Sequence, residues 1–150
     1  PQNVAPTVLR LEGFRAAMRE ANVTVREEWL AEAEYDIPRA IELTRGLLAT
    51  KDRPTAIIAP NDRVAGAIIR AIQEQKLSVP GDVSVIGFDD AEESGHYMPQ
   101  LTTVRIEWKQ MAESATRMLI EILQQRNINR VYVAIAPRLI VRESTAPPKN

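Results

Sequence analysis

Short runs of apolar residues alternate along this chain with longer stretches in which apolar residues recur every three or four positions. Short continuous runs are typical of strands that helices cover on both faces, and the longer period is typical of amphipathic helices. The pattern predicts helices at residues 7–21, 37–50, 62–75 and 107–125. It predicts strands at residues 23–30, 55–59, 83–88, 101–104, 131–136 and 138–141. We therefore predict an α/β fold with an open parallel sheet and helices on both faces.

The stretch at residues 79–90, VPGDVSVIGFDD, joins a turn, a buried strand and a polar exit. Pro80, Gly81 and Asp82 are turn residues, and the apolar run that follows ends at Asp89 and Asp90. Ligands of open α/β sheets bind in the crevice outside the carboxyl ends of the strands, where an ionised carboxylate accepts several hydrogen bonds. The alternative is that the two aspartates only cap the segment after the strand.

Polar residues also follow the two preceding predicted strands, as the pairs Tyr35-Asp36 and Asn61-Asp62. Because the carboxyl ends of parallel strands lie along one edge, we expect these groups to converge with Asp89. An aromatic ring, from Tyr35 or Trp108, covers the apolar face of a sugar or a base, while amides and carboxylates bind its polar groups. The sequence therefore predicts a site for a flat-faced polar ligand.

Composition narrows the function classes. The chain has 150 residues, 45% hydrophobic and 26% charged, with a net charge of −1, which favours one globular domain and disfavours nucleic-acid binding by these residues. It has no Cys and one His, so we expect no metal site and no cofactor, and no apolar run is long enough for a membrane span. We assign no catalytic residue, because the sequence has no nucleophile elbow or phosphate-binding loop.

Five segments, in this order, resemble the LacI/GalR family of bacterial transcription regulators. They are residues 10–14 (RLEGF), 59–62 (APND), 79–90 (VPGDVSVIGFDD), 99–104 (PQLTTV) and 139–145 (LIVREST). The resemblance implies a periplasmic-binding-protein-like core of two Rossmann-like subdomains, preceded by a helix-turn-helix headpiece. The chain resembles only the carboxyl-terminal part of that core, so we expect a partial chain.

The same resemblance implies a division of the chain. Residues 1–104 correspond to the carboxyl-terminal subdomain without its first strand, residues 105–136 to a crossover with a helix and strand of the amino-terminal subdomain, and residues 137–150 to a return segment and tail. In the family the first strand is central, and its loss exposes backbone and apolar surface. We expect preceding chain or a partner to supply it; a 150-residue fragment that folds as a soluble monomer would contradict this.

Ligand contacts are carried over by position from the family. Arg10, Asn61 and Asp89 correspond to polar contacts, Tyr35 to the stacking aromatic, and Trp108 to the residue that closes the cleft from the hinge side. Arg10 offers a donor fork, Asn61 donates and accepts, and Asp89 accepts.

A homodimer is also implied. The helix at residues 62–75, with Val64 and Ile68, and the loop with His96 and Tyr97 resemble the family's interface elements. The alternative for this loop is that it packs on its own domain.

The implied function is effector sensing by a cytoplasmic DNA-binding regulator, usually a repressor. A sugar or purine-like effector in the cleft between the subdomains favours one orientation, which changes the affinity of the absent headpiece for operator DNA. One alternative is a periplasmic sugar-binding receptor of the same fold. A carbohydrate-active enzyme that uses a carboxylate pair is the third hypothesis.

Overall fold

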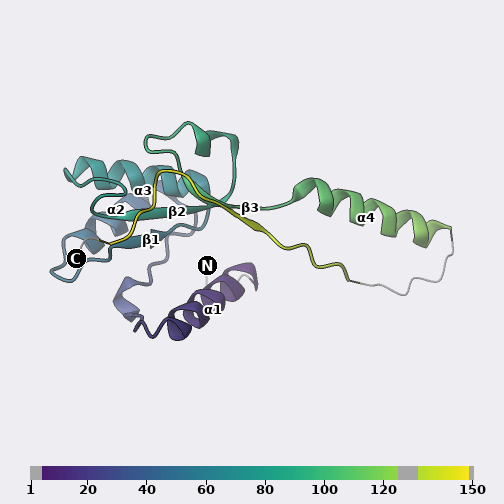
Figure 1. Cartoon of the computed structure of the whole chain (residues 1–150), viewed down its shortest axis with the longest axis horizontal. Helices are drawn as coiled ribbons and strands as arrows, with labels where there is room; N and C mark the ends of the chain where they lie inside the picture. The colour runs from purple at the N-terminus through teal and green to yellow at the C-terminus, as the bar shows by residue number, and fades with distance from the viewer. Residues whose placement is uncertain (1–4, 125–131, 149–150) are drawn as a thin grey trace.

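The computed structural model describes residues 5–124 and 132–148, and its centre is a four-stranded open sheet (Figure 1). The strands are β1 (Ala56–Ile58), β2 (Ser84–Asp89), β3 (Thr102–Arg105) and β4 (Arg138–Ile140), and they lie side by side in that order. β1, β2 and β3 are parallel, with Ile58 opposite Ile86 and Ile86 opposite Thr102. β4 is antiparallel to β3. The predicted α/β open sheet is confirmed, as a mainly parallel mixed sheet.

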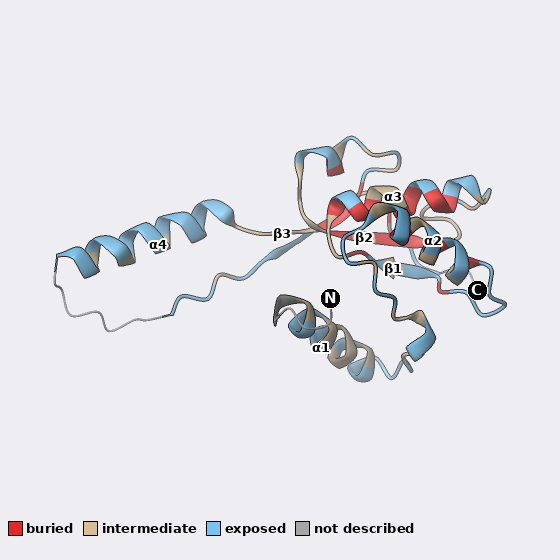
Figure 2. Ribbon diagram, turned by 180° about the vertical axis from the view of Figure 1, so that it is seen from behind, coloured by how far each residue is buried: buried red, intermediate tan, exposed pale blue. Residues whose placement is uncertain are grey.

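The four predicted helices are present. They are α1 (Ala5–Glu20), α2 (Ile37–Leu48), α3 (Asp62–Glu74) and α4 (Trp108–Leu123), with short 3₁₀ helices at Glu27–Trp29 and Glu92–Gly95. Two of them begin at side-chain caps, because Asp36 accepts the amide of Arg39 at 2.7 Å and Asn61 accepts the amide of Val64 at 2.8 Å. α2 and α3 lie on one side of the sheet and α1 on the other (Figures 1 and 2).

The hydrophobic core lies where α3 meets α2 and the sheet (Figure 2). Ile72, Val83, Val85 and Leu101 are completely buried there. This packing fixes the start of α3 against the ends of β1 and β2, which are the positions of the predicted site.

Two predicted strands are not formed. The prediction for residues 23–30 is wrong, since this segment contains the 3₁₀ helix at Glu27–Trp29, and Val23 is 47% exposed. Residues 132–136 form no strand, and Val131 lies outside the described residues. Both segments have apolar residues of high strand propensity, but a strand also needs a neighbour that satisfies its backbone groups, and neither segment has one among residues 5–124 and 132–148.

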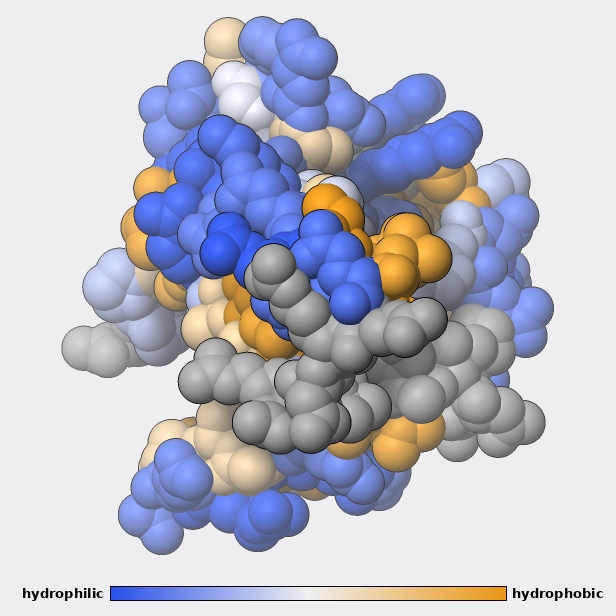
Figure 3. Space-filling model, turned by 90° about the vertical axis from the view of Figure 1, so that its right-hand side faces the viewer, coloured by the Kyte–Doolittle hydropathy of each residue, from blue (hydrophilic) through white to orange (hydrophobic). Residues whose placement is uncertain are grey.

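α4 stands away from the sheet and has no buried residue (Figures 1 and 2). β3 leads into this helix, and the chain returns from it through β4. Apolar surface is visible from the α4 end of the molecule (Figure 3), and Trp108, Ile122 and Leu123 are 60%, 54% and 73% exposed. The division at residues 104/105 and 136/137 stays a prediction. None of the described helices is long and apolar enough to cross a membrane.

Candidate ligand-binding site at the carboxyl edge of the sheet

Arg10 connects α1 to the carboxyl ends of β1 and β2. Its Nη1 donates a hydrogen bond of 2.9 Å to the carbonyl of Pro60, the residue between β1 and the cap of α3. Its guanidinium carbon lies 3.8 Å from the centre of the Phe88 ring, a cation–π contact. The structure therefore brings Arg10 to the edge where Asn61 and Asp89 are placed, although these residues are far apart in the sequence.

Asn61 is the N-terminal cap of α3 at this edge of the sheet. Its Oδ1 caps α3 by accepting the amide of Val64, which uses one of the two lone pairs of that oxygen. An asparagine side chain also carries two Nδ2 hydrogens, which this bond does not use. Asn61 is therefore oriented by the helix it caps, and its donor group is the part suited to a ligand.

Asp89 combines partial burial with an unusual backbone. Its φ is 108°, in a region that residues other than glycine rarely adopt, and such a conformation costs roughly 1–3 kcal/mol. Burial raises the pKa of its carboxyl and the negative charge of Asp62 raises it further, while the positive charge of Arg10 opposes both. The fold thus holds Asp89 at a free-energy cost at the predicted ligand position, beside a cation.

Asp62 is a buried support beneath this site. It is 1% exposed and accepts hydrogen bonds from the Ala91 amide, at 2.7 Å, and from the Thr103 hydroxyl. Burial raises the pKa of its carboxyl, although both hydrogen bonds lower it. Gly87 leaves the necessary space, because a Cβ at that position would lie 2.2 Å from Oδ1 of Asp62. The sequence placed Asp62 only in the polar pair that follows β1 and did not assign it a buried role; the glycine inside strand β2 was the available signal of a close approach.

Asp90 is the other half of the aspartate pair and has different partners. Its side chain is 7% exposed and forms ion pairs with Arg142, at 2.6 Å, and with Arg105. Burial raises the pKa of its carboxyl, but the hydrogen bonds and charges of the two arginines outweigh burial and lower the pKa overall. Asp90 therefore has an internal structural role, and its Oδ1 also accepts the hydroxyl of Ser94 in the segment after the strand.

The two predicted aromatic contacts are at the surface. Tyr35 precedes the cap of α2 with a φ of 61° and is 45% exposed, and Trp108 begins α4 and is 60% exposed. Their participation in one site with Arg10, Asn61 and Asp89 stays a prediction.

The predicted interface residues fall into two environments. Val64 and Ile68 are 1% and 5% exposed and belong to the hydrophobic core of their own domain, and their part in an interface stays a prediction. His96 is exposed. Tyr97 is half-buried and packs against Gly66 of α3, since its ring atoms are within 2.9 Å of where a Gly66 Cβ would be. This contact agrees with the alternative that the loop packs on its own domain.

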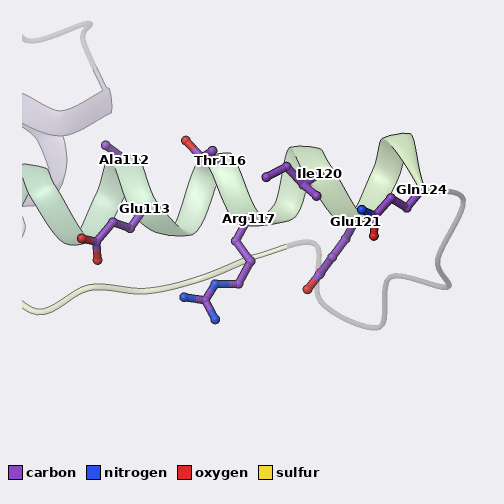
Figure 4. A pocket seen from close by; sticks show the side chains of 7 residues that line it. All are labelled: Ala112, Glu113, Thr116, Arg117, Ile120, Glu121 and Gln124. Carbon is purple, nitrogen blue, oxygen red and sulfur yellow. The ribbon is translucent and has the colours of Figure 1, made fainter.

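A separate shallow hollow runs along α4 (Figure 4). It is lined by Ala112, Glu113, Thr116, Arg117, Ile120, Glu121 and Gln124. All seven residues come from one helix, and Figure 4 shows their side chains pointing in several directions rather than toward a common point. Because all the lining residues come from one helix, this hollow lacks the convergent polar groups of a ligand site.

The sequence matches the profile of the periplasmic binding protein-like domain over residues 1–145, and the chain belongs to that family. Its relatives identify it more narrowly as part of a LacI/GalR-type effector-binding domain. It is 38% identical over 135 residues to an HTH-type transcriptional repressor PurR of Mannheimia succiniciproducens, and 35% identical to one of Photobacterium profundum. Each alignment covers 90% of this chain and 40% of the relative, so the chain spans less than half of those proteins.

Solved structures agree with this assignment. A LacI-family regulatory protein from Chloroflexus aggregans superposes with a TM-score of 0.92 at 28% identity, over 97% of this chain and 53% of that one. A complex of the transcriptional regulator CelR with cellobiose gives a TM-score of 0.86 at 28% identity, over 96% and 44% of the two chains. A dimeric Lac repressor gives 0.87 at 26% identity, over 99% and 54%.

Proposed function

We propose that this chain is the effector-sensing and dimerisation part of a cytoplasmic LacI/GalR-type transcriptional regulator. A small effector binds at the carboxyl edge of the sheet, in the cleft toward the amino-terminal subdomain, and its binding changes the affinity of a helix-turn-helix headpiece for operator DNA. The chain contributes recognition and coupling and performs no catalysis.

The observation that carries this proposal is the juxtaposition of a guanidinium, an amide and a carboxylate at one edge. Arg10 contacts the Pro60 carbonyl and the Phe88 ring. Asn61 caps α3, and Asp89 is the last residue of β2. Such a set binds the hydroxyls of a sugar or the ring nitrogens and carbonyls of a purine-like ligand. The cost of holding Asp89 in a partly buried, positive-φ position favours a binding role over a purely structural one.

The relatives support the ligand class and the assembly. The CelR structure contains cellobiose, and the Lac repressor structure is dimeric. For this chain we propose a homodimer that uses the exposed His96 and the adjoining loop.

A periplasmic sugar receptor of the same fold is the second candidate, because the same site geometry suits it. The gene sequence upstream of Pro1 separates the two. A helix-turn-helix segment supports the regulator, and a signal peptide supports the receptor.

The direct test is calorimetric titration of the full-length protein with cellobiose and with hypoxanthine. We expect one of them to bind without turnover, and Asp89→Asn to weaken that binding by about 1.5–3 kcal/mol, roughly ten- to a hundredfold, because a charge-assisted acceptor is lost. The control is Asp52→Asn, since Asp52 pairs with Arg26 on the exposed surface. Equal affinity of the Asp89→Asn variant and the wild type would refute the site assignment.

A further inference from the structure

Asp90 connects the end of β2 to both segments that link the sheet with α4. Its Oδ1 accepts Nη2 of Arg142 at 2.6 Å, and its Oδ2 accepts Nε of Arg105. Arg105 is the last residue of β3, which leads to α4, and Arg142 follows β4, by which the chain returns (Figure 1). One carboxylate thus binds the outgoing and the returning crossover together.

Arg142 extends this connection. Its Nη1 donates to the carbonyl of Leu101 at 2.7 Å and to the hydroxyl of Ser94 at 3.2 Å, and its backbone amide donates to the hydroxyl of Thr102. The side chain is only 19% exposed, so water competes little for these bonds. We name Asp90, Arg105 and Arg142 the crossover clamp.

The crossover clamp is adjacent to the ligand edge. Asp89 and Asp90 both have positive φ, at 108° and 55°, and the next amide, Ala91, is held by the buried carboxylate of Asp62. The backbone at Asp89 is therefore fixed by its pairing with Arg105 in the sheet and by the contacts of Asp90 and Ala91, while its own side chain interacts with the charges of Arg10 and Asp62. A displacement of either crossover therefore displaces Asp90, the residue next to Asp89.

We propose that the crossover clamp positions Asp89 and couples its position to the two crossovers, so that Asp90, Arg105 and Arg142 are positioning residues for ligand recognition. This inference rests on the proposed function, because it takes the edge at Asp89 as the ligand site. The ion pairs of Asp90 then link the position of Asp89, where the ligand binds, to the arrangement of the two crossovers.

A second ion pair on the same crossovers provides a matched control. Arg138 of β4 pairs with Glu107, which follows β3, so this pair also joins the outgoing and returning segments. It does not involve β2 or the aspartate pair. If the clamp only held the crossovers together, Arg138→Gln and Asp90→Asn would have the same consequences.

The first experiment is hydrogen–deuterium exchange of the full-length protein, which requires no ligand. We expect Asp90→Asn and Arg142→Gln to speed exchange about tenfold or more at residues 89–94 and in β3, with α2 and α3 unchanged. The double variant Asp90→Asn/Arg142→Gln should exchange little faster than either single variant, because each single variant already breaks the ion pair between Asp90 and Arg142. Arg138→Gln should leave residues 89–94 at the wild-type rate. Unchanged exchange at residues 89–94 in Asp90→Asn, or an equal increase throughout the fold, would overturn the clamp.

The second experiment measures binding of cellobiose and hypoxanthine to the same variants. We expect Asp90→Asn to weaken binding of the recognised compound about tenfold, and Arg138→Gln to leave it unchanged. Equal weakening by both variants would show a merely structural effect and overturn the proposal. If the wild type binds neither compound, the proposed ligand class fails, and the exchange at residues 89–94 alone decides on the clamp.

Discussion

α3 and α4 are built from similar patterns and have opposite surroundings. Both helices have apolar residues at helical spacing along one face, and both were predicted from that spacing. α3 buries seven residues against α2 and the sheet, whereas α4 buries none. Periodicity therefore predicts a helix and its apolar face, but the surface that covers this face is formed by residues far away in the sequence.

The largest expected difference between these helices is in core packing. Ile72 of α3 is 0% exposed and Ile122 of α4 is 54% exposed. Ile72→Ala should lower the free energy of unfolding by about 2–5 kcal/mol, because it leaves a cavity among packed side chains. Ile122→Ala should change it by less than about 0.5 kcal/mol. Urea unfolding of the chain, followed by circular dichroism at low protein concentration, measures both.

Equal costs for the two alanine variants would contradict the comparison. They would mean that the exposed face of α4 is covered in solution, and sedimentation at increasing concentration would then identify a second copy as the cover.

A smaller effect on the free energy of unfolding distinguishes Asp89 from Asp90 at the end of β2. Asp90→Asn should lower stability at pH 7 by about 1–3 kcal/mol, since it weakens the ion pairs with Arg105 and Arg142. Asp89→Asn should raise stability at pH 7, because it removes a partly buried charge beside Asp62. Urea unfolding of the two variants from pH 7 to pH 3 measures both changes.

The carboxyls of Asp89 and Asp90 contribute to the free energy of unfolding with opposite signs as the pH changes. The pKa of Asp90 is lowered in the fold, so its stabilisation is present above its ordinary pKa and is lost as the pH falls through the folded-state value. The pKa of Asp89 is raised, so its ionisation lowers stability as the pH rises through the folded-state value. The cost of Asp90→Asn should therefore vanish at acidic pH, and the gain from Asp89→Asn should vanish there too. A parallel pH profile for both variants would contradict the assignment of separate roles.

Local sequence signals predicted the parts of the fold that depend on short-range chemistry. The helix starts after Asp36 and Asn61, the apolar run before Asp89 and the periodicity of α3 all depend on residues close together in the sequence. The strand predicted at residues 23–30 failed because a strand depends on a neighbour, and β1 pairs only with β2 among the described residues.

The candidate site was predictable only in part for the same reason. Strand ends identified Asn61 and Asp89, and family resemblance identified Arg10, which the structure then brought to the same edge. The contacts of Asp62 and Arg142 involve partners 41 and 52 residues away, Thr103 and Asp90. Gly87 signals a close approach in β2 but does not identify these partners. The structure therefore adds the long-range polar contacts.

The smallest expected effect on stability concerns the end of α4. Leu123 is 73% exposed, so Leu123→Lys removes little buried area and should change the free energy of unfolding by less than about 0.5 kcal/mol. The same change should reduce self-association of the chain, because it interrupts exposed apolar surface with a charge. Sedimentation and urea unfolding of the variant measure the two effects. A loss above about 1 kcal/mol would show that α4 is packed in solution, and α4 would then resemble α3 in its surroundings as well as in its pattern.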